Sequence, residues 1–184
     1  MDFLEETYFY HIFNRGNNQQ SIFLDNDNYL HFLKLVKKHI LPVADIYSYC
    51  LLGNHFHFLV RINDECKKNP SQSFSNLFNS YSKAFNKRHN RIGSLFQRPF
   101  KRKRIIEEDY LRQLIIYIHL NPENHGIVND FELYPYSSYA SMLSNKPTNL
   151  KRTEVIELFG NKENFIFMHR KKPHNLSEFD DLQT

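Results

Sequence analysis

The chain has 184 residues, a length that predicts one domain large enough to bury a substantial core. Its 24 Lys and Arg against 20 Asp and Glu give a formal net charge of +4, with aromatic residues at 15% and only two cysteines. This composition excludes collagen-like, disulfide-rich and low-complexity disordered proteins.

Three features of the sequence bear on where the protein resides. No apolar run approaches the roughly 20 residues that a membrane-spanning helix needs. Residues 1–10 are acidic and lack the pattern of a signal peptide. Two cysteines, Cys50 and Cys66, make no disulfide framework. We therefore expect a cytoplasmic protein with both thiols reduced.

The first predicted elements are a strand and a helix. Residues 8–13 are rich in aromatic and β-branched residues and precede a cluster of turn-forming residues, as is typical of a strand. Residues 25–41 show helical periodicity, with Asp25 or Asp27 as the expected N-cap. The expected core-facing residues of this helix are Leu30, Leu33, Val36 and Ile40, with Lys37 as a polar intrusion.

A hairpin and a second helix follow. Residues 45–52 and 55–62 are apolar and aromatic-rich and flank a short Gly53-Asn54 turn, so they are expected to pair as antiparallel strands. Residues 71–88 repeat apolar side chains every three or four positions, which predicts a helix with one aromatic face.

The remaining elements complete a recognisable order. Residues 96–106 are expected to form a strand, and residues 107–120 an amphipathic helix that Pro122 closes. The first six predicted elements have the order β-α-β-β-α-β, which predicts an α+β fold with a ferredoxin-like antiparallel sheet, helices on one of its faces and extra C-terminal helices. Short helices are expected at residues 135–143 and 153–159. The acidic tail from Pro173 is expected to be poorly ordered.

Basic residues concentrate in one stretch. The 22 positions from Lys83 to Arg104 hold nine Lys or Arg and no Asp or Glu, with Phe85, Phe96 and Phe100 interleaved. A nucleic acid needs positive charge for its phosphates and flat side chains for stacking. The alternative interpretation is a solvated basic face beside core aromatics. The nine residues are Lys83, Lys87, Arg88, Arg91, Arg98, Lys101, Arg102, Lys103 and Arg104.

Two further patterns suggest chemistry. His55 and His57 alternate along a predicted strand, so their side chains share one face and can bind a single divalent metal. Two unrelated half-buried histidines would give the same pattern. Tyr117 and Asn121 are four positions apart near the end of a predicted helix, so their side chains can reach one point. Taken alone, Tyr117 fits a tyrosine at the edge of the core better than a nucleophile.

Together these segments resemble the single-tyrosine HUH transposases, and in particular the REP-associated tyrosine transposases of bacteria. The resemblance spans roughly residues 8–143. It rests on the following motifs: Tyr10-His11-Ile12-Phe13-Asn14-Arg15-Gly16, Leu51-Leu52-Gly53-Asn54-His55-Phe56-His57-Phe58-Leu59-Val60, Gly93-Ser94-Leu95-Phe96-Gln97-Arg98-Pro99-Phe100-Lys101, Tyr117-Ile118-His119-Leu120-Asn121-Pro122 and His125-Gly126.

The resemblance implies specific roles for the candidate residues. His55 and His57 match metal ligands, Asn121 matches a third ligand that supplies a side-chain amide, and Tyr117 matches a nucleophile that attacks a DNA phosphate. The implied cofactor is Mg²⁺ or Mn²⁺. Gly53 stands where the family often has proline, which should loosen the turn without removing a ligand. Tyr81 and Tyr110 are rival tyrosines outside the motif.

The implied activity is nicking and rejoining of single-stranded DNA at hairpins through a 5′-phosphotyrosine. Arg15, Asn17 and the nine basic residues are the expected DNA contacts. Residues 1–145 would form the transposase domain and residues 146–184 a helical extension with an acidic tail. We expect a monomer rather than a homodimer. The alternatives are a non-catalytic regulator that binds hairpin DNA or RNA on the same scaffold, and a metal-dependent phosphodiester hydrolase.

Overall fold

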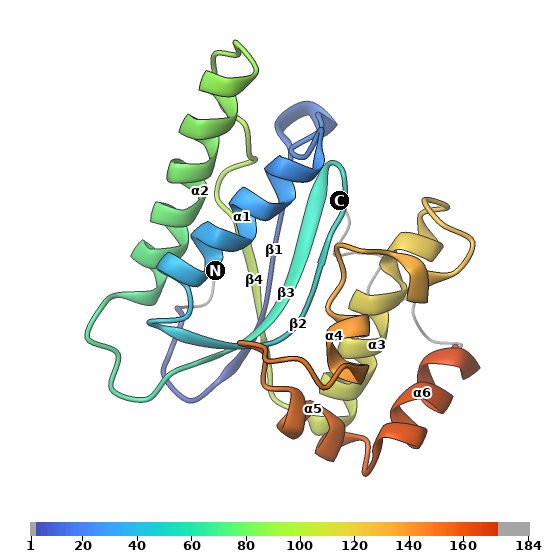
Figure 1. The fold of residues 1–184 in the computed structure, drawn as a ribbon. Coiled ribbons are helices and arrows are strands. Elements are labelled where there is room, and N and C mark those ends of the chain that lie inside the picture. Colours follow the sequence, from blue (N-terminus) through green and yellow to red (C-terminus); the bar gives the residue numbers. More distant parts are fainter. Residues whose placement is uncertain (1–2, 173–184) are drawn as a thin grey trace.

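A computed structural model describes residues 3–172 of the chain (Figure 1). Four antiparallel strands form one sheet in the order β2-β3-β1-β4. They are β1 (Phe9–Arg15), β2 (Ala44–Leu51), β3 (His55–Ile62) and β4 (Lys101–Ile105). With α1 (Asn26–His39) and α2 (Pro70–Arg88), they confirm the predicted β-α-β-β-α-β order and the α+β fold class.

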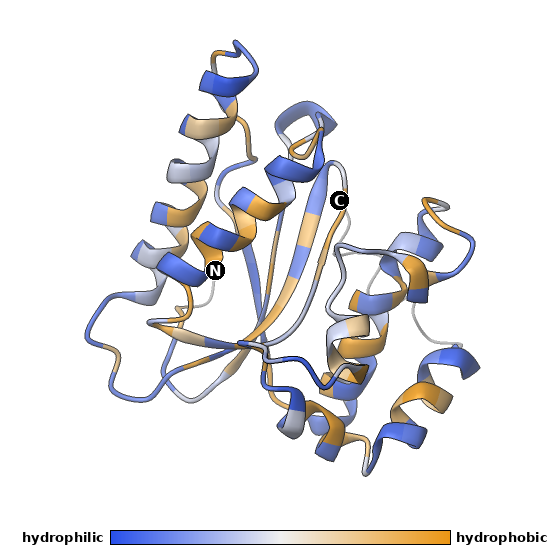
Figure 2. Cartoon of the chain, viewed as in Figure 1, coloured by the Kyte–Doolittle hydropathy of each residue, from blue (hydrophilic) through white to orange (hydrophobic). Residues whose placement is uncertain are grey.

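The sheet separates two hydrophobic cores. Side chains alternate along a strand, so Phe56 and Phe58 of β3 join a core with α1 and α2. Leu59 joins the other core, which is centred on α3 (Glu108–Asn124). Figure 1 shows α1 and α2 beside one another and α3 on the other side of the strands, and Figure 2 shows hydrophobic positions along the central strands. The two faces therefore have different surroundings.

Helix α1 begins where the sequence indicates, and its core face matches the prediction at Val36 but not at Leu30. The Asp25 side chain caps it by accepting a hydrogen bond from the Asn28 amide at 2.9 Å. Leu30, predicted to face the core, is 54% exposed, whereas Phe32 is fully buried. Two residues along a helix are about 200° apart. Burial of the large Phe32 ring therefore places Leu30 on the solvent side.

The prediction that Pro122 closes the third helix is wrong. Helix α3 continues to Asn124 with Pro122 inside it. Proline removes one backbone donor, but here it lies in the last turn, where the His125 amide still donates to the Asn121 carbonyl at 3.0 Å. Asn121 consequently keeps its helical position, and its Nδ2 donates to the Tyr117 carbonyl at 3.1 Å.

Short helices after α3 complete its core. They are η2 (Phe131–Leu133), α4 (Tyr139–Leu143), α5 (Arg152–Leu158) and α6 (Lys162–Lys171). The sequence predicted helices around α4 and α5 but missed α6, which carries only Phe165 and His169 as buried residues. The predicted strand 96–106 is shorter, because Phe96 makes only an isolated bridge to Gly16. The tail from Pro173 lies outside the described residues.

Over the described part of the chain, no helix combines the length and the apolar character that crossing a membrane requires.

Candidate metal centre and its tyrosine

Strand β3 presents two histidines toward α3. His55 and His57 lie on one face of the strand, and their ring centroids are 5.2 Å apart with the rings perpendicular. Phe56 and Phe58 point into the core on the opposite face. The alternation predicted from the sequence is therefore confirmed. Hydrogen bonds from the Ile22 and Phe23 amides to the Gly53 carbonyl, at 2.8 and 3.0 Å, anchor the turn that leads into β3.

Helix α3 places Tyr117 and Asn121 against these histidines. The Tyr117 ring contacts His57, with centroids 5.7 Å apart and an interplanar angle of 83°. The Asn121 side chain lies close enough to His55 to raise the pKa of that imidazole slightly against the larger effects that lower it. The structure thus brings the four residues singled out in the sequence to one place.

Three electron-pair donors at this place lack hydrogen-bond partners. Nε2 of His55, Nε2 of His57 and Oδ1 of Asn121 are all buried, and none makes a hydrogen bond. Buried polar atoms are seldom left unsatisfied in native proteins. Imidazole nitrogen and amide oxygen are both ligands for divalent ions such as Mn²⁺. The three residues therefore fit a metal ion with two imidazoles and one amide.

In the described part of the chain, no three His, Cys, Asp or Glu side chains are grouped so that they could hold a metal. The candidate centre differs because its third ligand is an amide.

Both candidate histidine ligands are held in the neutral form that binds metals. Burial lowers the pKa of His55 to about 3, helped by the charges of His125 and Arg15. Burial also lowers the pKa of His57 well below its usual value, with His11, His55 and His125 adding to the effect. Both imidazoles are consequently uncharged at neutral pH.

Neighbouring side chains orient the two rings. Nδ1 of His55 donates to Oδ1 of Asn54 at 2.7 Å, which leaves the lone pair on Nε2. Nδ1 of His57 lies 2.9 Å from Nε2 of His11, a fully buried residue on β1. Sequence reasoning assigned no role to His11. The signal was its place in the Tyr10–Gly16 segment, but only the β1–β3 register brings it to His57.

The rival tyrosines lie elsewhere. The hydroxyl of Tyr81 donates to the Ile22 carbonyl at 2.5 Å within the α1–α2 core. The hydroxyl of Tyr110 accepts from Nζ of Lys103 at 2.7 Å near the start of α3. Of the three, Tyr117 is the one whose ring contacts His57. Its side chain is only 1% exposed, so a phosphate can reach its hydroxyl only after a local rearrangement.

The predicted DNA-contacting residues fall into two groups. Lys83, Lys87, Arg88 and Arg91 lie on the second half of α2 and the turn after it, and Arg98 follows in the next loop. Arg88 forms ion pairs with Asp25 and Asp27, at 3.0 and 2.9 Å. These carboxylates come from helix α1 and the residue before it. The stretch from Lys83 to Arg104 contains no acidic residue, but the fold places acidic side chains next to it.

The second group lines β4, the strand at the edge of the sheet. Lys103 pairs with His11 in the β1–β4 register, so Lys101 and Lys103 share the face of the candidate metal centre. Arg102 and Arg104 lie on the other face; Arg102 donates to Oγ of Ser71 at 3.0 Å, and Arg104 pairs with Glu5 at 3.4 Å.

Two predicted contacts lie at the end of β1. Arg15 pairs with His55 in the β1–β3 register. The Asn17 amide donates to the Leu95 carbonyl at 2.9 Å, which ties this end to the loop before β4.

Comparisons with known proteins bear on the fold. No family model and no curated protein matches the chain. Among solved structures, the chain is similar to a REP-associated tyrosine transposase bound to a REP hairpin. The two share 18% sequence identity with a TM-score of 0.61, over 80% of this chain and 87% of that one. This likeness shows that the chain has the same fold.

Proposed function

We propose that the protein is a metal-dependent endonuclease and strand transferase that acts on single-stranded DNA at hairpins. The observation that carries this proposal is the convergence of three unpartnered buried donor atoms, on His55, His57 and Asn121, beside the ring of Tyr117. The shared fold with a transposase bound to a REP hairpin supports it. So does the resemblance of the sequence motifs to that family.

A divalent ion would be held by Nε2 of His55, Nε2 of His57 and Oδ1 of Asn121. When bound, such an ion polarises a phosphate oxygen and orients the phosphate. Two imidazoles and an amide suit Mn²⁺ better than Mg²⁺, which prefers oxygen ligands in an octahedron. Mg²⁺ is nonetheless the more available ion, and both are candidates.

Tyr117 would act as the nucleophile. A phenol with an ordinary pKa near 10 attacks poorly at neutral pH, so its proton must leave as the bond forms. The phenolic oxygen forms a bond to phosphorus, and the bond from phosphorus to the 3′ oxygen breaks. That oxygen takes up a proton and becomes a free 3′-hydroxyl. The protein is left with a 5′-phosphotyrosine, which the reverse reaction can rejoin to a strand.

The basic residues would hold the DNA. Lys101 and Lys103 lie on the face of the candidate metal centre, and Arg15 lies opposite His55. We assign residues 1–145 to the transposase domain and the remainder to an extension, and we propose that the protein acts as a monomer.

Covalent trapping tests this function. A labelled hairpin oligonucleotide with single-stranded flanks is incubated with protein and Mn²⁺ or Mg²⁺, and the products are separated on a denaturing gel. We expect a protein–DNA adduct that EDTA abolishes. Binding without an adduct would instead indicate a non-catalytic regulator, and a shortened strand without an adduct would indicate a hydrolase.

A further inference from the structure

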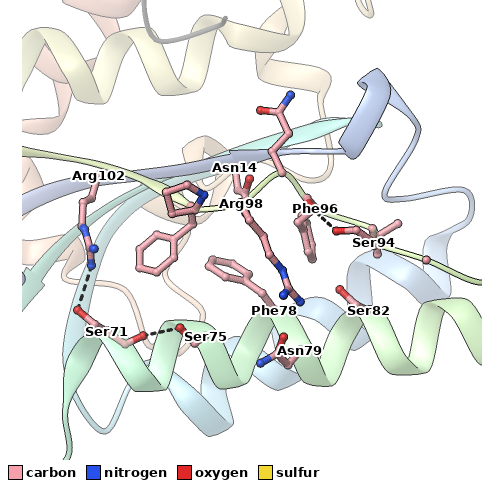
Figure 3. A pocket seen from close by; sticks show the side chains of 15 residues that line it. Asn14, Ser71, Ser75, Phe78, Asn79, Ser82, Ser94, Phe96, Arg98 and Arg102 are labelled. Carbon is pink, nitrogen blue, oxygen red and sulfur yellow. Dashed lines mark hydrogen bonds between the residues drawn. The ribbon is translucent and has the colours of Figure 1, made fainter. Parts of the chain in front are cut away.

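A cavity of about 580 Å³ lies between α2 and residues 93–100 (Figure 3). It belongs to the sheet face opposite the candidate metal centre, because its wall includes Asn14 and Arg102. Those residues alternate with Phe13 and Lys101 along β1 and β4. No residue described above as part of the candidate metal centre lines this cavity.

Aromatic rings form the apolar part of its wall. The Phe78 ring lies 5.4 Å from that of Phe96 and 5.3 Å from that of Phe100, measured between centroids. Phe78 and Phe96 are buried, whereas Phe100 is half-buried. The Phe78 ring is inclined by 56° to Phe96 and by 60° to Phe100, and the Arg102 guanidinium lies 4.8 Å from the Phe100 centroid. The wall is therefore not one plane, and a nucleobase can stack on the face of a single ring.

Polar and cationic side chains form the rest of the cavity wall. Helix α2 contributes Ser75 and Asn79, and residues 93–100 contribute the exposed Arg98. Figure 3 shows the Arg98 side chain extending toward Phe78 and Asn79. No acidic residue lines the cavity, and within the described part of the chain Arg98 forms no ion pair. Hydroxyl and amide groups read base edges, and a guanidinium binds phosphate.

The cavity and the metal centre meet at one end of the sheet. Asn14 lines the cavity, and the next residue, Arg15, pairs with His55 in the β1–β3 register. Consecutive Cα atoms are about 3.8 Å apart. The two sites are therefore neighbours on opposite faces of the sheet. Between them runs the edge formed by β4 and the preceding loop, where the Gln97 amide donates to the Arg15 carbonyl at 2.9 Å.

Positive charge continues around this edge. Lys101 and Lys103 lie on the face of the metal centre, and Arg98 lies at the cavity on the other face. A phosphate backbone that crosses the edge would meet a cation on each side.

We propose that this cavity binds one unpaired nucleotide of the DNA strand while a neighbouring part of the strand lies at the metal centre. The base would stack on the Phe78 and Phe100 side of the cavity, Ser75 and Asn79 would contact its edge, and Arg98 would bind its phosphate. This inference rests on the proposed function, since it assumes a single-stranded DNA substrate.

Binding in the presence of EDTA tests the inference, because it requires neither metal nor cleavage. The ligand is a hairpin oligonucleotide in which each unpaired position in turn is replaced by an abasic site. We expect one abasic position to weaken wild-type binding about tenfold, a loss typical of a stacked base. The variant Asn79→Ala, which removes a contact to the base edge, should bind the intact strand similarly weakly and lose little more at that position. Such coupling identifies a shared contact. Arg98→Gln should weaken binding to the intact and the abasic strands by the same factor, because an abasic site keeps the phosphate.

A matched control is Asn76→Ala, which changes the same residue type one turn earlier on α2 outside the cavity. Asn79→Ala or Arg98→Gln binding like this control would overturn the inference, as would an Asn79→Ala protein that loses affinity equally at every abasic position. Mononucleotides that compete as strongly as the strand would assign the cavity to a free nucleotide and also overturn it. If coupling is observed but no metal-dependent adduct forms, the proposed catalysis is wrong and the proposed nucleotide site stands. If an adduct forms without coupling, the proposed nucleotide site is wrong and the proposed function stands.

Discussion

Nε2 of His11 lies 2.9 Å from Nδ1 of His57, and the two rings stack with centroids 5.1 Å apart. Metal-binding histidines commonly use their second ring nitrogen in this way, and the partner fixes both the tautomer and the ring orientation. When Nδ1 of His57 donates to His11, the lone pair of His57 is placed on Nε2, the atom without another partner. His11 would therefore act as a positioning residue for a metal ion bound at the candidate centre.

Replacing His11 should weaken metal binding. The variant His11→Phe removes the partner of His57, and the loss of such a contact typically costs 10–100-fold in metal affinity. We expect a rise of this size in the Kd for Mn²⁺ measured by isothermal titration calorimetry. His11→Gln keeps an acceptor and should lose less. The exposed His31 provides the control His31→Phe, and a Kd for His11→Phe equal to that of this control would argue against the assigned role.

Substitutions of Asn121, the third candidate ligand, should weaken metal binding when they remove its side-chain oxygen and preserve it when an oxygen remains. Asn121→Leu removes Oδ1 and should abolish adduct formation and weaken Mn²⁺ binding, as should His55→Ala. Asn121→Asp retains an oxygen ligand and should keep Mn²⁺ binding.

EDTA should stop cleavage while leaving hairpin binding nearly intact in a gel-shift assay. Metal-independent cleavage by the wild-type protein would show that this centre is not needed.

Basic residues on the edge strand should set the salt dependence of DNA binding. The double variant Lys101→Gln, Lys103→Gln removes two charges on the face of the metal centre. The slope of log K against log salt is negative, and each lost phosphate contact makes it shallower by about 0.7 for single-stranded DNA. A matched control is Lys162→Gln, Lys171→Gln on α6. An unchanged slope in fluorescence anisotropy titrations would place the DNA path elsewhere.

Buried histidines should make stability depend on pH. Nδ1 of His119 lies 2.9 Å from Nε2 of His169, and burial lowers the pKa of His169 to about 4. The unfolded chain, with a histidine pKa near 6.5, takes up protons that the folded chain excludes. Stability is therefore fully present above pH 6.5 and is lost as the pH falls toward 4.

The variant His169→Gln removes one of these groups. Its free energy of unfolding should fall about 2 kcal/mol less than that of the wild-type protein between pH 7 and pH 5. Urea unfolding at the two pH values measures this difference, with His31→Gln as the exposed control. Equal losses in His169→Gln and wild type would show that His169 does not contribute.

The parts of the site that follow local periodicity could be predicted from the sequence. Alternation along a strand put His55 and His57 on one face, and the four-residue spacing put Asn121 one turn beyond Tyr117. The contact between His11 and His57 could not be predicted, because it depends on the register of two strands that lie far apart in the sequence. Likewise, the ion pairs that Asp25 and Asp27 make with Arg88 arise only when α1 packs against α2.

Other differences between prediction and structure arise where tertiary packing overrides a local sequence preference. Leu30 satisfied a helical pattern, but the larger Phe32 took the core position. Pro122 signals a helix end, yet α3 accommodates it in its last turn. The sequence pattern did not predict helix α6, because only two of its residues, Phe165 and His169, are buried. The cavity beside Phe78 combines residues from α2 and the loop before β4 with Asn14 of β1, so no single segment indicates it.

The most direct test of the proposed function is adduct formation by Tyr117→Phe on a labelled hairpin oligonucleotide with Mn²⁺, with Tyr110→Phe as the matched tyrosine control. We expect the Tyr110→Phe protein to form the covalent adduct. We expect Tyr117→Phe to form none while it binds the oligonucleotide with nearly wild-type affinity. An adduct formed by Tyr117→Phe at the wild-type level would show that the proposed mechanism is wrong and would assign the nucleophile to another residue.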